Sequence, residues 1–249
     1  MEKTKVKLFA DRQFYHKLFI IMFPIALQSL MLSAVAAADA IMLGRIEQDS
    51  MAAVSLATQV QFIQNMITSA YTGAAAILGA QYYGKGDMRT INDIFCMSLR
   101  LMTGVSLLFF VLCFFFPEYL MMIFASDPVL IEIGAGYLKI AAWSYLITGF
   151  SQCYLTIMKV TGHPGTTALV SSCTVLLNII LNGILIFGLF GLTPMGAQGA
   201  ALATLIARIV ELAWGIAISY KKGYMHPDFS RFFVKNPQLS KDFRKCYLP

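Results

Sequence analysis

The feature that most constrains this chain is a series of apolar runs, each long enough to cross a lipid bilayer. A hydrocarbon core of ~30 Å needs about 20 mostly apolar residues when it is spanned by a helix. Because lipid offers no partner to open backbone groups, we expect each run to be helical. The sequence therefore predicts an all-α, polytopic membrane protein, a six-helix transmembrane bundle. The runs cover residues 18–43, 51–80, 94–116, 133–158, 166–190 and 196–220.

Composition and charge agree with a membrane location. Of 249 residues, 58% are hydrophobic and 13% are charged, whereas soluble domains carry about 25% charged residues. Most of the 19 Lys and Arg residues fall in the N-terminal segment, in the second and fourth loops and in the tail after residue 220. Positive loops mark the cytoplasmic side, so we expect both termini there. The net charge of +6 then indicates contact with the bilayer and no nucleic-acid partner.

An acid in the first run is the clearest functional candidate. Asp39 is the one carboxylate between residues 18 and 43, and it lies roughly 31 Å along the helix from Leu18. It is either an acid near the outer interface or a carboxylate that faces a cavity and titrates or holds a cation. Arg208 and Glu211, three residues apart in the sixth run, favour a structural ion pair within one helix.

Polar side chains recur at helical spacing on the second and fifth runs. In the fifth run, Asn178 and Asn182 continue a face that begins with Ser171 and Thr174. Amides in hydrocarbon need partners, so these two either join helices by hydrogen bonds or supply oxygen ligands to a cation. A polar stripe on an apolar helix predicts a solute cavity. The candidate cavity residues are Gln28, Gln61, Gln64, Asn65, Thr68, Thr72, Gln152 and Thr156.

Enzyme chemistry finds little support in these runs. No His lies within a run to act as a base for an intramembrane serine, and a paired aspartyl site needs a second acid beside Asp39. The chain also has no Gly-rich phosphate loop ending in GK[ST]. We therefore expect no catalytic residues, and a secondary transporter is the class that fits best.

Several segments, in order along the chain, carry a family pattern. They are 23–27 (FPIAL), 38–44 (ADAIMLG), 51–55 (MAAVS), 79–87 (GAQYYGKGD), 159–164 (KVTGHP), 178–188 (NIILNGILIFG) and 195–204 (MGAQGAALAT). In this order and spacing the chain resembles the multidrug and toxic-compound extrusion (MATE) transporters. The resemblance extends over residues from about 10 to 222.

The resemblance implies a cation-coupled antiporter that exports amphipathic, often cationic, drugs or toxic compounds and needs no cofactor besides a coupling ion, Na⁺ or H⁺. It implies an ion-coupling site at Asp39, Asn178, Asn182 and Thr204, the first three being candidate Na⁺ ligands. Many relatives carry Asp where this chain has Asn182, which leaves the choice between Na⁺ and H⁺ open. The implied location is the cell membrane, of the bacterial inner or plasma membrane type.

The length of the chain departs from the family pattern, which has two six-helix lobes around a central cleft. We expect residues 1–222 to form one lobe, and residues 223–249 to form a cytoplasmic linker and the start of a second lobe. Three interpretations stay open. The chain is a piece of a full transporter, or a half-transporter that pairs with another chain, or a six-span protein of another class. That last class includes a relative of lipid-linked sugar flippases and a non-transporting or partner-dependent subunit. The expected partners are lipid, small amphipathic substrates and a second six-helix lobe.

Overall fold

The described part of the chain is helical throughout. The computed structural model describes residues 12–223, 232–233 and 237–247, and no strand occurs among them. The all-α prediction is therefore confirmed for these residues. The helices are α1 (Arg12–Gly44), α2 (Gln48–Gly84), α3 (Met88–Phe115), α4 (Pro117–Phe124), α5 (Pro128–Val160), α6 (Pro164–Phe187), the 3₁₀ turn η1 (Leu189–Gly191), α7 (Gly196–Lys222) and α8 (Pro237–Tyr247).

Four of the described helices are long and apolar enough to cross a membrane: α3, α5, α6 and α7. These coincide with the third to sixth apolar runs of the sequence. Helices α1 and α2 contain the first two runs and have 33 and 37 residues, but they are not among the four. That α1 and α2 also span the bilayer stays a prediction.

Helix ends follow from local chemistry. The side chain of Asp87 accepts a hydrogen bond from the backbone N–H of Thr90 at 3.0 Å and begins α3. Hydrogen bonds from Thr90 also hold the pKa of Asp87 below its ordinary value. At the other end of a helix, Gly188 terminates α6 with φ 69°. A Cβ at Gly188 would lie 2.6 Å from the carbonyl oxygen of Leu192, so the turn requires glycine.

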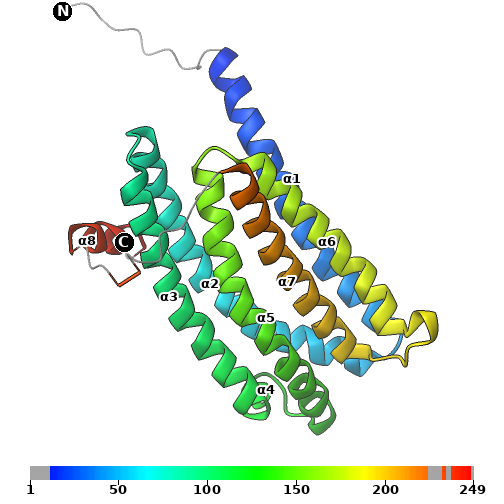
Figure 1. The fold of residues 1–249 in the computed structure, drawn as a ribbon. Coiled ribbons are helices and arrows are strands. Elements are labelled where there is room, and N and C mark those ends of the chain that lie inside the picture. The colour runs from blue at the N-terminus through cyan, green and yellow to red at the C-terminus, as the bar shows by residue number, and fades with distance from the viewer. Residues whose placement is uncertain (1–11, 224–231, 234–236, 248–249) are drawn as a thin grey trace, which may run out of the picture.

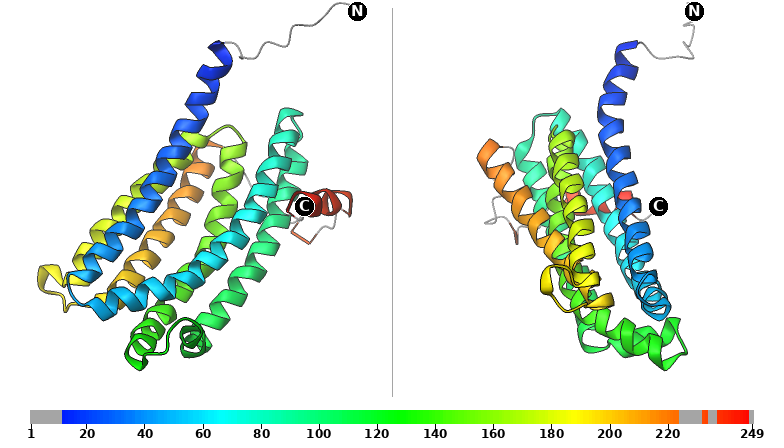
Figure 2. Two further views of the ribbon diagram at one scale, coloured as in Figure 1. Left: turned by 180° about the vertical axis from the view of Figure 1, so that it is seen from behind. Right: turned by 90° about the vertical axis from the view of Figure 1, so that its right-hand side faces the viewer.

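The bundle is organised around α5, which packs against α2, α3, α4 and α7 (Figure 1). Helix α1 lies along α6, and α6 pairs with α7, as Figure 2 shows from two further directions. At Gly149 of α5, a Cβ would clash with the hydroxyl of Ser106 and lie 3.3 Å from the carbonyl oxygen of Met102. Glycine at this position lets α3 and α5 approach closely.

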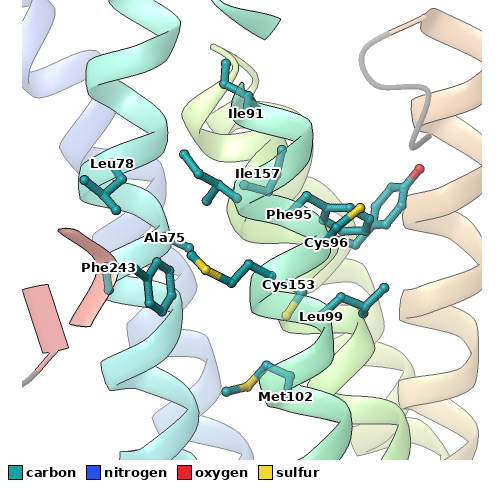
Figure 3. Packing of buried hydrophobic residues seen from close by; sticks show 14 of the residues in the cluster. Ala75, Leu78, Ile91, Phe95, Cys96, Leu99, Met102, Cys153, Ile157 and Phe243 are labelled. Carbon is teal, nitrogen blue, oxygen red and sulfur yellow. The ribbon is translucent and has the colours of Figure 1, made fainter. Parts of the chain in front are cut away.

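Two clusters of buried apolar side chains hold the bundle together. The cluster in Figure 3 joins α2, α3 and α5 through side chains such as Leu78, Phe95 and Ile157. The other cluster lies around Leu138 and Tyr145 and includes residues of α6 and α7. Many large apolar side chains outside these clusters are exposed, as at Leu108 and Ile123, which is the surface expected of helices that face lipid.

The short helix α8 was not anticipated within the proposed linker. It lies beside α2 and α3 (Figure 1), and its Leu239 and Phe243 are buried in the cluster of Figure 3. Residues 224–231, 234–236 and 248–249, which belong to the same proposed linker, lie outside the described residues. The expectation that 223–249 begins a second lobe stays a prediction.

Candidate functional site

A cavity of about 460 Å³ lies among α1, α2, α5, α6 and α7. Its α2 wall is a polar stripe at helical spacing that contains Gln61, Asn65, Thr68 and Thr72. Gln152 of α5 lines the same cavity. These five predicted cavity residues therefore line one cavity, although their role in binding a solute stays a prediction.

Of the other three predicted cavity residues, two do not line the cavity, and the side chain of the third is not described. Gln64 is 1% exposed and does not line the cavity. Its amide nitrogen donates to the backbone carbonyl of Tyr145 at 2.9 Å, which ties α2 to α5. Thr156 is half-buried and is not among the lining residues, and the side chain of Gln28 lies outside the described part of the chain.

The predicted ion-coupling residues form a continuous hydrogen-bonded series across three helices. Asn182 of α6 donates to Asp39 of α1, and also to the side-chain oxygen of Asn178 at 3.2 Å. Asn178 in turn donates to the hydroxyl of Thr204 on α7 at 3.3 Å. We call these four residues the Asp39 cluster. The structure thus brings together the residues that the sequence singled out, three of which line the cavity: Asp39, Asn178 and Thr204.

Burial and hydrogen bonding make this cluster electrostatically unusual. Asn182 is 0% exposed, and its side-chain oxygen has no hydrogen-bond partner among the described atoms. Asp39 is half-buried, and the hydrogen bond described for its carboxylate comes from a neutral amide. Tyr137 of α5, which sequence reasoning missed, also lines the cavity. A carboxylate, amide oxygens and a hydroxyl are donors suited to a hard cation or a proton.

A second buried carboxylate lies between α5, α6 and α7. Glu211 accepts hydrogen bonds from Arg208 at 2.8 Å, from Ser151 at 2.9 Å and from Ser171 at 3.1 Å. We call these four residues the Glu211 cluster. The ion pair expected from the i, i+3 spacing is confirmed. Ser171 belongs to the polar face predicted for the fifth run. Helical spacing could not predict the approach of the two serine hydroxyls to Glu211, nor the position of Arg208 on the cavity wall.

Long apolar helices around a cavity with polar walls define a multi-pass membrane protein with room for a solute. Residues 24–184 match the family model MatE. The chain belongs to this family of membrane transporters, and its fold is that of one lobe.

Individual relatives and structures agree with this assignment. The chain is 25% identical over 249 residues to an uncharacterized transporter, YisQ, of Bacillus subtilis strain 168, and 28% identical over 196 residues to a probable multidrug resistance protein, NorM, of Rhizobium meliloti strain 1021. Those alignments cover 100% and 78% of this chain. Among solved structures, a MOP superfamily transporter from Pyrococcus furiosus superposes with a TM-score of 0.80 at 20% identity over 91% of the chain. The MATE transporter VcmN of Vibrio cholerae, in its bent form, gives 0.80 at 17% identity over 92%.

The matches cover only part of the length of each relative. The chain spans 54% of the length of YisQ and 41% of that of NorM. It spans 50% and 51% of the two solved chains. This chain thus corresponds to about half the length of the proteins it matches.

Proposed function

We propose that this chain is the ion-coupling lobe of an antiporter that exports amphipathic, often cationic, compounds in exchange for Na⁺ or H⁺. The observation that carries the proposal is the Asp39 cluster, a carboxylate beside an unpartnered buried amide oxygen at the edge of a polar cavity. The relatives named as probable multidrug resistance proteins support the substrate class. The chain acts in transport and not as an enzyme.

The proposed mechanism follows from the charge at Asp39. In the membrane interior a carboxylate without a cationic partner is costly, so it gains by binding Na⁺ or a proton. Asn178, Asn182 and Thr204 would add neutral oxygen ligands on α6 and α7. Because a ligand shifts a conformational equilibrium only by its differential affinity for the two states, the ion and the exported compound must favour different arrangements of α1 against α6 and α7.

The proposal also includes a second lobe and a location in the membrane. Alternating access needs a second lobe, on the same polypeptide or on another chain, that closes the cavity from the opposite side. We place the lobe in the cell membrane, of the bacterial inner or plasma membrane type, with lipid around its exposed apolar helices. The basic N-terminal segment and C-terminal tail lie on the cytoplasmic side.

A binding measurement tests the ion site without requiring transport. The melting temperature of the purified chain in detergent is measured with increasing NaCl, against choline chloride at equal ionic strength, and as a function of pH. Since an ion that binds the folded state stabilises it, we expect stabilisation by Na⁺ or by protonation that is lost in Asp39→Asn. Equal stabilisation of Asp39→Asn and the unchanged chain would overturn the assignment of Asp39.

Transport is tested separately in vesicles with Na⁺ and proton gradients imposed one at a time. An ethidium-like dye should leave only under the gradient of the coupling ion, and Asp39→Asn should not expel it. Glu118→Gln is a matched control, because Glu118 is an exposed acid of α4 that does not line the cavity. Efflux by Asp39→Asn at the original rate would contradict the mechanism.

A further inference from the structure

Arg208 gives the cavity a charge that the proposed ion site does not use. Among the described residues that line the cavity, Asp39 is the one acid and Arg208 the one base. A charged side chain at membrane depth is costly, and it faces a cavity or a partner when it occurs. Arg208 does both, because its side chain is 21% exposed while it pairs with Glu211.

The guanidinium of Arg208 is held in position by its ion pair with Glu211, which does not line the cavity. Glu211, whose side chain is 3% exposed, holds Nη1 of Arg208 at 2.8 Å. The carboxylate of Glu211 is itself held by hydroxyls of Ser151 on α5 and Ser171 on α6. Since a guanidinium has five N–H donors, this one ion pair leaves donors available to the cavity.

Arg208 is the part of the Glu211 cluster that reaches the cavity. Glu211 and its two serine partners do not line the cavity, whereas Arg208 does. The negative charge of the ion pair is therefore buried behind the wall, and the positive charge faces the cavity.

The two charged ends of the cavity are separated along the bundle. On α6, Asn182, which donates to Asp39, lies one turn from Asn178. On α7, Thr204, which accepts from Asn178, lies one turn from Arg208. Two steps of four residues at 1.5 Å per residue amount to ~12 Å. The wall between the two ends carries polar and apolar side chains in comparable measure, such as Thr174 and Val175.

We propose that Arg208 binds the carboxylate of zwitterionic amphipathic substrates, whose cationic part lies toward Asp39. This inference rests on the proposed function and adds a specificity determinant to it. A guanidinium presents paired N–H donors that match a carboxylate. Its partner Glu211 keeps the guanidinium oriented before the substrate arrives, which lowers the cost of binding.

The test compares two dyes that differ at one group. A rhodamine with a free carboxylate and the ethyl ester of the same rhodamine are titrated against the full chain in lipid nanodiscs, and binding is followed by fluorescence anisotropy. The variant is Arg208→Gln combined with Glu211→Gln, which removes both charges and leaves no unpaired buried carboxylate. Arg89→Gln, at an exposed position of α3, is the matched control.

A charge-assisted hydrogen bond contributes enough for about a tenfold change in affinity or more. We expect the Kd of the carboxylate dye to rise by at least about tenfold in the double variant, while the Kd of the ester changes by less than about threefold. Arg208→Lys should give an intermediate Kd for the carboxylate dye. Arg89→Gln should bind both dyes as the unchanged chain does.

An unchanged Kd for the carboxylate dye, or equal weakening of both dyes, would overturn the inference and leave Arg208 as a structural partner of Glu211. Dye binding needs no ion gradient. A failure here is therefore distinct from a failure of the proposed antiport, which is read from the effect of Asp39→Asn on ion-dependent stability and efflux.

Discussion

Two carboxylates on the described helices, Glu211 and Asp39, have opposite surroundings. Glu211 has a guanidinium at 2.8 Å and two serine hydroxyls. Asp39 has the neutral amide of Asn182 as its described hydrogen-bond donor. Glu211 is therefore compensated within the protein, whereas no cation among the described residues pairs with Asp39. In the proposed function, the coupling ion takes that place.

The largest effect on stability should come from removing the cationic partner of Glu211. Arg208→Ala leaves Glu211 buried without its guanidinium, and breaking a buried pair in this way costs about 3–5 kcal/mol of unfolding free energy. The measurement is denaturant unfolding in micelles. Arg208→Gln with Glu211→Gln should recover most of that loss, and a double variant as unstable as Arg208→Ala would show that the charge is not the cause.

The stability of the chain should depend much less on Asp39, the acid without a described cationic partner. Asp39→Asn should change the free energy of unfolding without added ion by no more than about 1 kcal/mol, because no buried cation loses its partner. It should remove the ion-dependent part, which amounts to about 2.7 kcal/mol at an ion concentration of 100 Kd. Thermal unfolding with and without the ion measures both quantities. Strong destabilisation without ion would indicate that Asp39 is as structural as Glu211.

Neutral hydroxyls in the two clusters allow a finer comparison. Thr204→Val removes the hydrogen bond from Asn178 and the one to the carbonyl oxygen of Ala200, and Ser151→Ala removes the one to Glu211. Each variant should cost about 1 kcal/mol of unfolding free energy. They differ in ion binding, where Thr204→Val should weaken ion-dependent stabilisation and Ser151→Ala should leave it intact. Equal effects of the two variants on ion-dependent stabilisation would erase the distinction between the clusters.

The smallest effect is expected at Asp87, a carboxylate in the loop before α3 and outside both clusters. Hydrogen bonds from Thr90 lower the pKa of Asp87 below its ordinary value of 3.8. A depressed pKa contributes stability above the unfolded value, and this contribution is lost as pH falls through the folded value. Asp87→Asn should therefore remove a slight acid sensitivity below about pH 4, read from thermal unfolding between pH 3 and pH 6. A larger loss at neutral pH would contradict a purely local role.

Sequence patterns could predict the parts of the site that lie on one helix. Asn178 and Asn182 share a face by spacing alone, and the pairing of Arg208 with Glu211 follows from their separation by three residues. The contact of Thr204 with Asn178 was reached through the family resemblance. These relations depend on helical periodicity, which the sequence contains.

Relations between helices depend on rotation and approach, which periodicity leaves undetermined. One residue step turns a side chain by about 100°, so Asn65 lines the cavity while Gln64 bonds to α5. The hydroxyls of Ser151 and Ser171 meet Glu211 across 60 and 40 residues of sequence. The docking of Phe243 on α2 and α3 likewise involves tertiary packing of a segment that composition presents as a polar linker.

The close approach of α3 and α5 at Gly149 divides the lobe mechanically. At Gly149 the backbone of α5 lies so close to α3 that a methyl group has no room. Sliding of one helix past the other is therefore sterically opposed, and we expect α3 and α5 to move together as a rigid pair. Helix α1, which carries Asp39, lies along α6 and is not part of that pair. The lobe thus has a tightly packed helix pair and a carboxylate on a separate helix. In the proposed function, a change in ion occupancy at Asp39 would therefore act first on α1 and only then on α3 and α5.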